Sequence, residues 1–238
     1  MTTLGMIRVA AATPRLKVAN PAENEAEILK LMHSADEAGA GILLLPELTI
    51  TGYSAGDLFH QELLYQRQLE SLSHIAESSR NTKLVTVLGF MLRLENNFYN
   101  CAALIQNGRI KGIVPKMFLP NAKEFYEARW FASGTAIAEA KNSVHIFGYE
   151  TAFGNLIFTD ESSGLSLGIE ICEDLWLPIT PSSHLALNGA QIILNPSASD
   201  ETVGKSDYRR SLVSVQSAKS ICGYVYASAG VSESPTDL

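Results

Sequence analysis

Glu47, Lys116 and Cys172 each stand at the C-terminal end of a short apolar run of the sequence. The runs are residues 42–45, 113–114 and 165–171. Apolar runs of this kind predict strands that are covered on both faces of a sheet. Because ligands bind at the carboxyl ends of strands in open α/β sheets, we expect a carboxylate, an ammonium group and a thiol to meet in one pocket.

These three groups suit the hydrolysis of an amide. The thiol of Cys172 becomes a strong nucleophile once a base removes its proton, and a carboxylate behind a strand end, such as that of Glu47, suits that role. Attack on the amide builds negative charge on oxygen, which Lys116 and the backbone N–H of Glu173 would stabilise. Taken singly, each residue also fits a structural role, so the prediction depends on their combination.

Strand-like and helix-like segments alternate along the chain. Asn20 and Pro21, followed by Glu23, indicate a capped helix N-terminus, and Asn107-Gly108 indicates a hairpin turn. The predicted strands cover residues 6–12, 42–45, 84–90, 99–105, 109–114, 155–159, 165–171, 191–194 and 224–229, and the predicted helices cover residues 21–38, 60–79, 182–187 and 207–221. This order predicts an α/β architecture, a mixed sheet with helices packed on it.

Composition excludes several classes of protein. The 238 residues carry a formal net charge of -7 without a basic run, so neither nucleic acid nor an anionic membrane is an expected partner. No signal-peptide pattern begins the sequence, and no apolar run approaches the roughly 20 residues that cross a bilayer, so we predict a cytoplasmic protein. The cysteines, Cys101, Cys172 and Cys222, are far apart and odd in number, which predicts neither disulfides nor a metal site. Core packing is expected for Cys101 and Cys222.

Two other kinds of site are weighed against the amidase. Residues 199–206 fit a phosphate-binding P-loop except at the first position, where Ser199 replaces the glycine. A cysteine–histidine hydrolase needs a histidine partner, and the five histidines fall mostly on predicted helices, with no strand-end placement like that of Glu47. Both alternatives are therefore weaker than the combination of Glu47, Lys116 and Cys172.

Three blocks of sequence resemble the signature blocks of the carbon–nitrogen hydrolase, or nitrilase, superfamily. They are LLLPELTITGYSAGDLF (43–59), KMFLPNAKEFYEARWF (116–131) and GIEICEDLW (168–176). Together with NPSAS-x5-K (195–205) and YVYASAG-x-SESPTDL (224–238), the extended pattern is similar to the glutaminase domain of glutamine-dependent NAD+ synthetases. The resemblance covers nearly the whole chain and implies a compact four-layer αββα sandwich with mixed sheets.

The resemblance also implies roles for particular residues. Cys172 would be the nucleophile that forms a glutamyl thioester, Glu47 the general base and acid, and Lys116 the oxyanion stabiliser. A second glutamate of the family, which holds the lysine, matches Glu127, with Glu124 as the other possibility. The residues that would hold the amino-acid end of glutamine are Glu173, Ser199 and Lys205. Related enzymes place a tyrosine where this chain has Ala122.

By the same resemblance, residues 1–238 are expected to form a single carbon–nitrogen hydrolase domain, truncated at its C-terminus and without the synthetase domain. ATP, Mg²⁺ and deamido-NAD+ are expected only for that absent domain, and no cofactor or metal is expected here. The expected partners are glutamine, the synthetase domain of the same parent chain, and a second copy of this chain. Hydrolysis of another small amide, or a non-catalytic docking role, remains the alternative.

Overall fold

The computed structural model describes residues 5–233, which form eleven strands and five α-helices. The strands are β1 (Val9–Ala11), β2 (Ile42–Leu44), β3 (Val85–Leu94), β4 (Asn97–Gln106), β5 (Arg109–Pro115), β6 (Ser143–Ile146), β7 (Tyr149–Phe153), β8 (Ile157–Asp160), β9 (Leu165–Ile169), β10 (Ile192–Ser197) and β11 (Gly223–Ser228). The α-helices are α1 (Pro21–Glu37), α2 (Glu62–Ser78), α3 (Gly134–Ala140), α4 (Pro181–Leu187) and α5 (Lys205–Ser220). Short 3₁₀ helices are η1 (Tyr53–His60), η2 (Ser79–Asn81), η3 (Glu127–Arg129), η4 (Cys172–Trp176) and η5 (Val231–Glu233).

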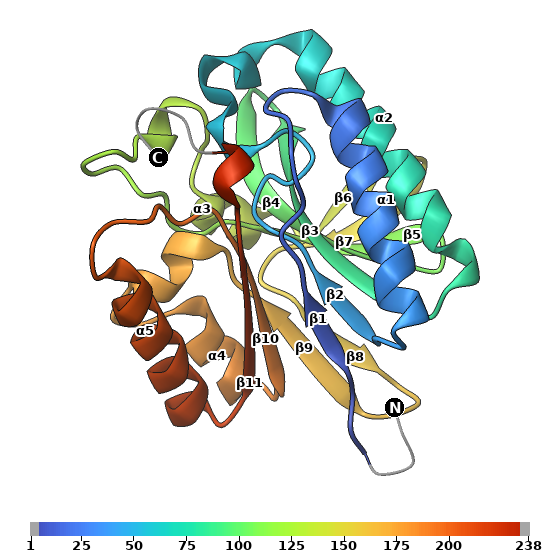
Figure 1. Ribbon diagram of the computed structural model, residues 1–238, viewed down its shortest axis with the longest axis vertical. Coiled ribbons are helices and arrows are strands. Elements are labelled where there is room, and N and C mark those ends of the chain that lie inside the picture. The colour runs from blue at the N-terminus through green and yellow to red at the C-terminus, as the bar shows by residue number, and fades with distance from the viewer. Residues whose placement is uncertain (1–4, 234–238) are drawn as a thin grey trace.

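The strands form two sheets that lie between two pairs of helices. One sheet has seven strands in the order β1-β2-β3-β4-β5-β7-β6, and the other has four in the order β11-β10-β9-β8. Both sheets contain parallel and antiparallel pairs. Figure 1 shows α1 and α2 on one outer side and α4 and α5 on the opposite side, with the strands between them. The predicted four-layer αββα sandwich is therefore confirmed.

Strand β2 shows why its sequence is apolar at consecutive positions. Leu43 faces the helices and packs in a cluster with Ile28 of α1 and Leu72 of α2. Ile42 and Leu44 face the other way and pack in a second cluster between the sheets. That inner cluster draws on both sheets and includes Val87, Ala102, Val114, Leu167, Ile169 and Leu194. A strand with both faces covered needs apolar side chains on both faces, as the sequence predicted.

Local signals in the sequence place several elements correctly. Asn20 caps α1, because its side chain accepts the backbone N–H of Glu23 at 3.4 Å and donates to the Glu23 carboxylate at 2.9 Å. Asn107 and Gly108 take positive φ angles of 52° and 74° in the turn between β4 and β5, as a tight hairpin requires. None of the helices within residues 5–233 is long and apolar enough to cross a lipid bilayer.

Some boundaries differ from the prediction. The strand predicted over residues 6–12 covers only Val9–Ala11, and the strand predicted over residues 165–171 ends at Ile169, before η4 begins at Cys172. Helix α3 and strands β6 and β7 were not predicted, because these short elements carry no periodic apolar pattern. Residues 234–238, on which part of the family resemblance falls, lie outside the described residues.

Candidate active site

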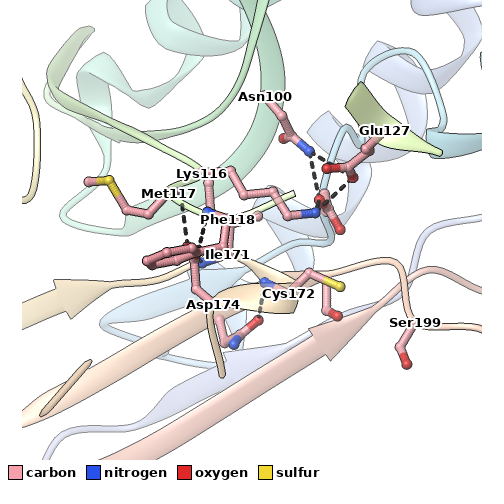
Figure 2. A network of polar contacts seen from close by, with 12 residues as sticks. Asn100, Lys116, Met117, Phe118, Glu127, Ile171, Cys172, Asp174 and Ser199 are labelled. Carbon is pink, nitrogen blue, oxygen red and sulfur yellow. Dashed lines mark hydrogen bonds and ion pairs between the residues drawn. The ribbon is translucent and has the colours of Figure 1, made fainter. Parts of the chain in front are cut away.

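Lys116 lies between two buried carboxylates. It follows the last residue of β5, and its Nζ atom lies 2.6 Å from Glu47 Oε1 and 2.7 Å from Glu127 Oε1. All three side chains are fully buried. Figure 2 shows Lys116 reaching Glu127 from the neighbouring segment. Because a buried ammonium group needs paired charges and hydrogen bonds, this arrangement fixes the position of Lys116 closely.

Asn100 completes this cluster from the neighbouring strand β4. Its Nδ2 atom donates to Glu47 Oε1 at 2.6 Å and lies 3.5 Å from Glu127 Oε1. Glu47 Oε2, in contrast, is buried and has no hydrogen-bond partner among the described residues. An unsatisfied buried carboxylate oxygen is rare and needs an explanation, and a catalytic role is one of them.

Two glycines let the backbone near these side chains pack closely. A Cβ atom on Gly89 of β3 would lie 2.1 Å from the backbone nitrogen of Leu48 and 2.7 Å from Glu47 Cα. A Cβ atom on Gly134 would lie 2.6 Å from the carbonyl oxygen of Lys116. Any larger residue at either position would displace the segment that carries Glu47 or Lys116.

Burial and the neighbouring charges set the protonation of the cluster. Burial raises the pKa of Glu127 to about 7; Lys116 opposes this rise, and Glu47 adds to it. Burial disfavours the charged form of Lys116, but Glu127 and Glu47 outweigh it and hold the pKa of Lys116 well above its usual value. Lys116 therefore carries its positive charge at neutral pH.

Cys172 begins η4 in a strained backbone conformation. Its φ angle is 46°, in the left-handed region that costs a residue with a side chain about 1–3 kcal/mol and is concentrated at functional sites. Burial, followed by the charge of Glu47, raises the pKa of its thiol to about 12, while Lys116 opposes the rise. The thiol is therefore neutral at pH 7 and needs a base before it can attack.

A chain of buried hydrogen bonds holds the backbone of Cys172. Asn195 Oδ1, at the carboxyl-terminal half of β10, accepts the Cys172 N–H at 3.0 Å. Asn195 Nδ2 donates to the Tyr224 hydroxyl at 2.8 Å, and that hydroxyl donates to Glu170 Oε1 at 2.5 Å. The strained conformation of Cys172 is thus supported by side chains of β10 and β11.

Asp174 connects the segment after Lys116 to the turn that carries Cys172. Its carboxylate accepts the backbone N–H groups of Ile171 and Phe118, both at 2.9 Å, and Met117 N lies 3.5 Å away. Figure 2 shows Asp174 beneath Met117 and Phe118. Burial raises the pKa of Asp174 to about 8 despite these bonds. One side chain therefore sets the spacing between Lys116 and Cys172.

A cavity of about 530 Å³ opens at Cys172. It is lined by Pro120, Asn121, Ala122, Lys123, Glu124, Phe125, Cys172, Glu173, Trp176, Ser199, Asp200, Thr202, Val203, Gly204, Lys205 and Tyr208. The residues expected to hold an amino-acid ligand all line this cavity: Glu173, Ser199 and Lys205. Ala122 also lies there, at the position where related enzymes carry tyrosine.

Two of the expected ligand groups already have protein partners. Lys205 pairs with Asp200, and the Ser199 hydroxyl accepts a hydrogen bond from Arg209 at 2.9 Å. Lys205 Nζ also lies 5.3 Å from the centre of the Trp176 ring. Burial raises the pKa of Glu173, with Lys116 and Lys205 opposing the rise. Arg209 was not predicted, since an arginine on a helix is usually a solvated residue.

Lys116 contacts Glu47, and the charges of both residues act on the Cys172 thiol, which lies on the facing sheet. Glu47 and Lys116 follow β2 and β5 of the seven-stranded sheet, whereas Cys172 follows β9 of the four-stranded sheet. Of the two candidate glutamates, Glu127 contacts Lys116, and Glu124 lines the cavity instead.

Cys101 and Cys222 are buried in apolar clusters, as expected. Within residues 5–233, no group of three or more histidine, cysteine, aspartate or glutamate side chains is arranged to hold a metal ion.

Residues 8–233 match the model of the carbon–nitrogen hydrolase family, and the chain belongs to this family of enzymes. It is 38% identical over 236 residues to the glutamine-dependent NAD(+) synthetase of Mycobacterium bovis, which covers 98% of this chain and 34% of that protein. A similar protein of the same name from Rattus norvegicus is 30% identical over 203 residues, or 82% of this chain and 28% of its own length. The chain thus spans about a third of the length of these relatives.

Solved structures give the same picture. A glutamine-dependent NAD(+) synthetase from Cytophaga hutchinsonii superposes with a TM-score of 0.81 at 33% identity, over 94% of this chain and 36% of that one. An amidase of the nitrilase superfamily from Nesterenkonia AN1 superposes with a TM-score of 0.75 at 19% identity, over 94% of this chain and 76% of that one. At 19% identity, the likeness to the amidase shows a shared fold and nothing about its reaction.

Proposed function

We propose that the chain hydrolyses the side-chain amide of glutamine to glutamate and ammonia through a thioester on Cys172. The observation that carries the proposal is the unpartnered, buried Oε2 atom of Glu47, a carboxylate whose charge acts on the neutral thiol of Cys172. The 38% identity to glutamine-dependent NAD(+) synthetases supports the choice of glutamine.

The first half of the reaction forms the thioester. Glu47 takes the thiol proton of Cys172 as the sulfur attacks the amide carbon, so that a C–S bond forms and the carbonyl oxygen becomes an oxyanion. Collapse of this intermediate breaks the C–N bond, and Glu47 passes its proton to the departing nitrogen, which leaves as ammonia. In the second half, Glu47 takes a proton from water as the water oxygen attacks the thioester carbon. The C–S bond then breaks, Glu47 returns the proton to the Cys172 sulfur, and glutamate leaves.

Two donors stabilise the oxyanion in this scheme. An ammonium group has three N–H bonds, and Lys116 directs two of them to Glu47 and Glu127, which leaves one for the substrate oxygen. The backbone N–H of Glu173 is the second donor, because the N–H of Cys172 itself already bonds to Asn195. Removing one donor of this kind typically costs about 10²–10³ in kcat.

Glutamine fits the charges of the cavity. The Glu173 carboxylate would bind the α-ammonium group, and Lys205 with the Ser199 hydroxyl would bind the α-carboxylate. Since Lys205 pairs with Asp200 and Ser199 with Arg209, the α-carboxylate would compete with Asp200 or join these pairs.

The ammonia would be consumed elsewhere. Because the relatives are named glutamine-dependent NAD(+) synthetases and are about three times as long, we propose that a synthetase domain of the parent chain uses the ammonia to convert deamido-NAD+ to NAD+. ATP and Mg²⁺ would bind that domain, whereas the hydrolysis at Cys172 balances with water alone. Three further predictions from the sequence stand as made: a single domain over residues 1–238, self-association, and a cytoplasmic location.

The test is ammonia release from glutamine by the complete protein. Wild type should release ammonia and glutamate in equal amounts, and Cys172→Ala should release none. Cys222→Ala is the matched control, since Cys222 is a buried thiol whose sulfur donates to the carbonyl oxygen of Ala190, and it should keep its activity. Cleavage of other small amides with glutamine left intact would replace this proposal by that of a general amidase. No cleavage of any amide would indicate a docking role.

A further inference from the structure

Glu233 is a buried carboxylate close to the active site that the proposed mechanism does not use. It ends η5, the last element that the structure describes, and only 5% of its surface is exposed. Its Oε2 atom accepts the backbone N–H of Tyr53 at 2.5 Å, and its carbonyl oxygen accepts the Ser54 hydroxyl at 2.6 Å. Residues 180 positions apart in the sequence are thereby joined.

The segment that carries Glu233 is fastened on a second side. The Ser232 hydroxyl accepts the backbone N–H of Leu16 at 3.0 Å, and Thr13 donates to the carbonyl oxygen of Ser228 at 2.9 Å. Gly52, with a φ angle of 77°, approaches so closely that a Cβ atom there would lie 3.2 Å from Glu233 Oε2. Glu233 therefore sits at a fixed distance from the start of η1.

Tyr53 connects Glu233 to Lys116, because its backbone N–H bonds to Glu233 and its ring lies near the Lys116 ammonium group. Its buried ring has its centre 6.0 Å from Lys116 Nζ, and it meets the ring of Phe125 edge-on, with the two centres 6.3 Å apart. Phe125 in turn lines the cavity. Burial raises the pKa of Tyr53 well above its usual value, and Glu127, Glu47 and Cys172 add to the rise, so the hydroxyl stays neutral beside them.

We propose that Glu233 is a positioning residue of the active site, which fixes the backbone of Tyr53 and thereby the ring that covers the Lys116 ammonium group. Glu233 touches no substrate and acts only through Tyr53. The inference rests on the amide hydrolysis proposed above for its kinetic test, although the contact itself does not depend on the substrate.

Two substitutions of Glu233 distinguish a role of its side-chain length from a role of its charge. Glu233→Gln keeps a carbonyl oxygen at the same reach for the Tyr53 N–H and removes the charge. Glu233→Asp keeps the charge but shortens the side chain by one methylene, so the bond to Tyr53 is lost or the segment shifts. We expect Glu233→Gln to keep kcat within about threefold, and Glu233→Asp to lower kcat about 10- to 100-fold with little change in KM, since small misplacements at a reacting centre have effects of this size.

A double-mutant cycle with Tyr53→Leu, which removes the ring but keeps the backbone N–H, tests whether the effect passes through the ring of Tyr53. If it does, Glu233→Asp should cost much less in the Tyr53→Leu background than in wild type. Glu161→Asp, the same change at an exposed carboxylate in the turn between β8 and β9, is the matched control and should leave kcat unchanged. Circular dichroism of each variant verifies that it is folded.

Labelling of Cys172 by chloroacetamide, followed by mass spectrometry, gives a second measurement that needs no substrate. Glu233→Asp should change the labelling rate and Glu233→Gln should not. Equal kcat and equal labelling rates in Glu233→Asp and Glu233→Gln would overturn the role of Glu233. So would a double variant in which the two losses of kcat simply multiply. If wild type releases no ammonia from any amide, the proposed function fails, and the labelling rates still decide the role of Glu233.

Discussion

The side-chain oxygen of Asn195 accepts the backbone N–H of Cys172 at 3.0 Å. This bond serves two purposes in the proposed mechanism. It supports the left-handed conformation of Cys172. It also engages the backbone N–H of Cys172, which is then not free to donate to the oxyanion. The oxyanion is then left to Lys116 and to the N–H of Glu173, which lie on different segments of the chain.

Asn195→Ala should therefore lower kcat for glutamine by about 10- to 100-fold, because the turn at Cys172 loses its support and the nucleophile shifts. Tyr224→Phe is the milder control. It removes the bonds of the Tyr224 hydroxyl to Glu170 and Asn195 Nδ2 but keeps the Asn195 oxygen that accepts the Cys172 N–H, so its loss of kcat should be smaller. Steady-state ammonia release measures both. Wild-type kcat in a folded Asn195→Ala protein would contradict the role of this bond.

The neutral thiol of Cys172 predicts how its alkylation depends on pH. Since burial and the charge of Glu47 raise the pKa of the thiol to about 12, the labelling rate should keep rising between pH 8 and pH 10 instead of levelling off as for an exposed cysteine. Glu47→Gln removes the base that takes the thiol proton, so its labelling at pH 8 should be slower than that of wild type, and its ammonia release should be lost. Peptide mass spectrometry distinguishes Cys172 from Cys101 and Cys222, and equal labelling of Glu47→Gln and wild type at pH 8 would show that Glu47 does not act on this thiol.

Close packing around Glu47 predicts a strong effect of a single methyl group. In Gly89→Ala the new Cβ would overlap the backbone of Glu47 and Leu48, which cannot move without shifting the carboxylate. We expect a loss of about 1–3 kcal/mol in the free energy of unfolding, together with a lower kcat. Gly223→Ala is the control, because its new Cβ would lie at an ordinary 3.6 Å from Ile192. Chemical denaturation and ammonia release measure the two effects, and equal stability of the two variants would refute the packing argument.

The sequence predicted the reactive groups better than the groups that hold them. Glu47, Lys116 and Cys172 stand at strand ends, where a polar residue after an apolar run is conspicuous. Asn100 and Asn195 lie inside β4 and β10, and nothing in the sequence shows which way their side chains face. A polar residue within an otherwise apolar strand was the available signal, since a buried amide must find a hydrogen-bond partner.

The two-sheet arrangement could not be derived from the residues alone. Strand periodicity identifies β2, β5 and β9, but pairing between distant strands depends on contacts far apart in the sequence. The family resemblance, rather than periodicity, predicted that these strands divide between facing sheets. The role of Glu233 is hidden for the same reason, because its partner Tyr53 is 180 residues away.

Asp174 predicts a pH dependence of stability. In the folded protein burial raises its pKa from 3.8 to about 8, so the folded state holds a proton that the unfolded chain releases. Unfolding then releases a proton between about pH 4 and pH 8, and the free energy of unfolding falls as the pH rises through this window. Glu127 and Glu233, whose pKa values burial raises to about 7, contribute in the same direction. Asp174→Asn should flatten the dependence measured by denaturation at several pH values, and an unchanged slope would show that Asp174 is ionised in the fold.

Glu173 predicts how the cavity distinguishes glutamine from simpler amides. If its carboxylate binds the α-ammonium group, Glu173→Gln should raise KM for glutamine about tenfold or more, since a hydrogen bond between charged groups contributes about 1.5–3 kcal/mol. The same variant should change KM little for 4-carbamoylbutanoate, which lacks the ammonium group. Glu124→Gln is the matched control, because Glu124 is another carboxylate on the same cavity without an assigned role. Competition kinetics with both substrates separates these outcomes, and an equal rise in KM for both would mean that Glu173 shapes the cavity without recognising the ammonium group.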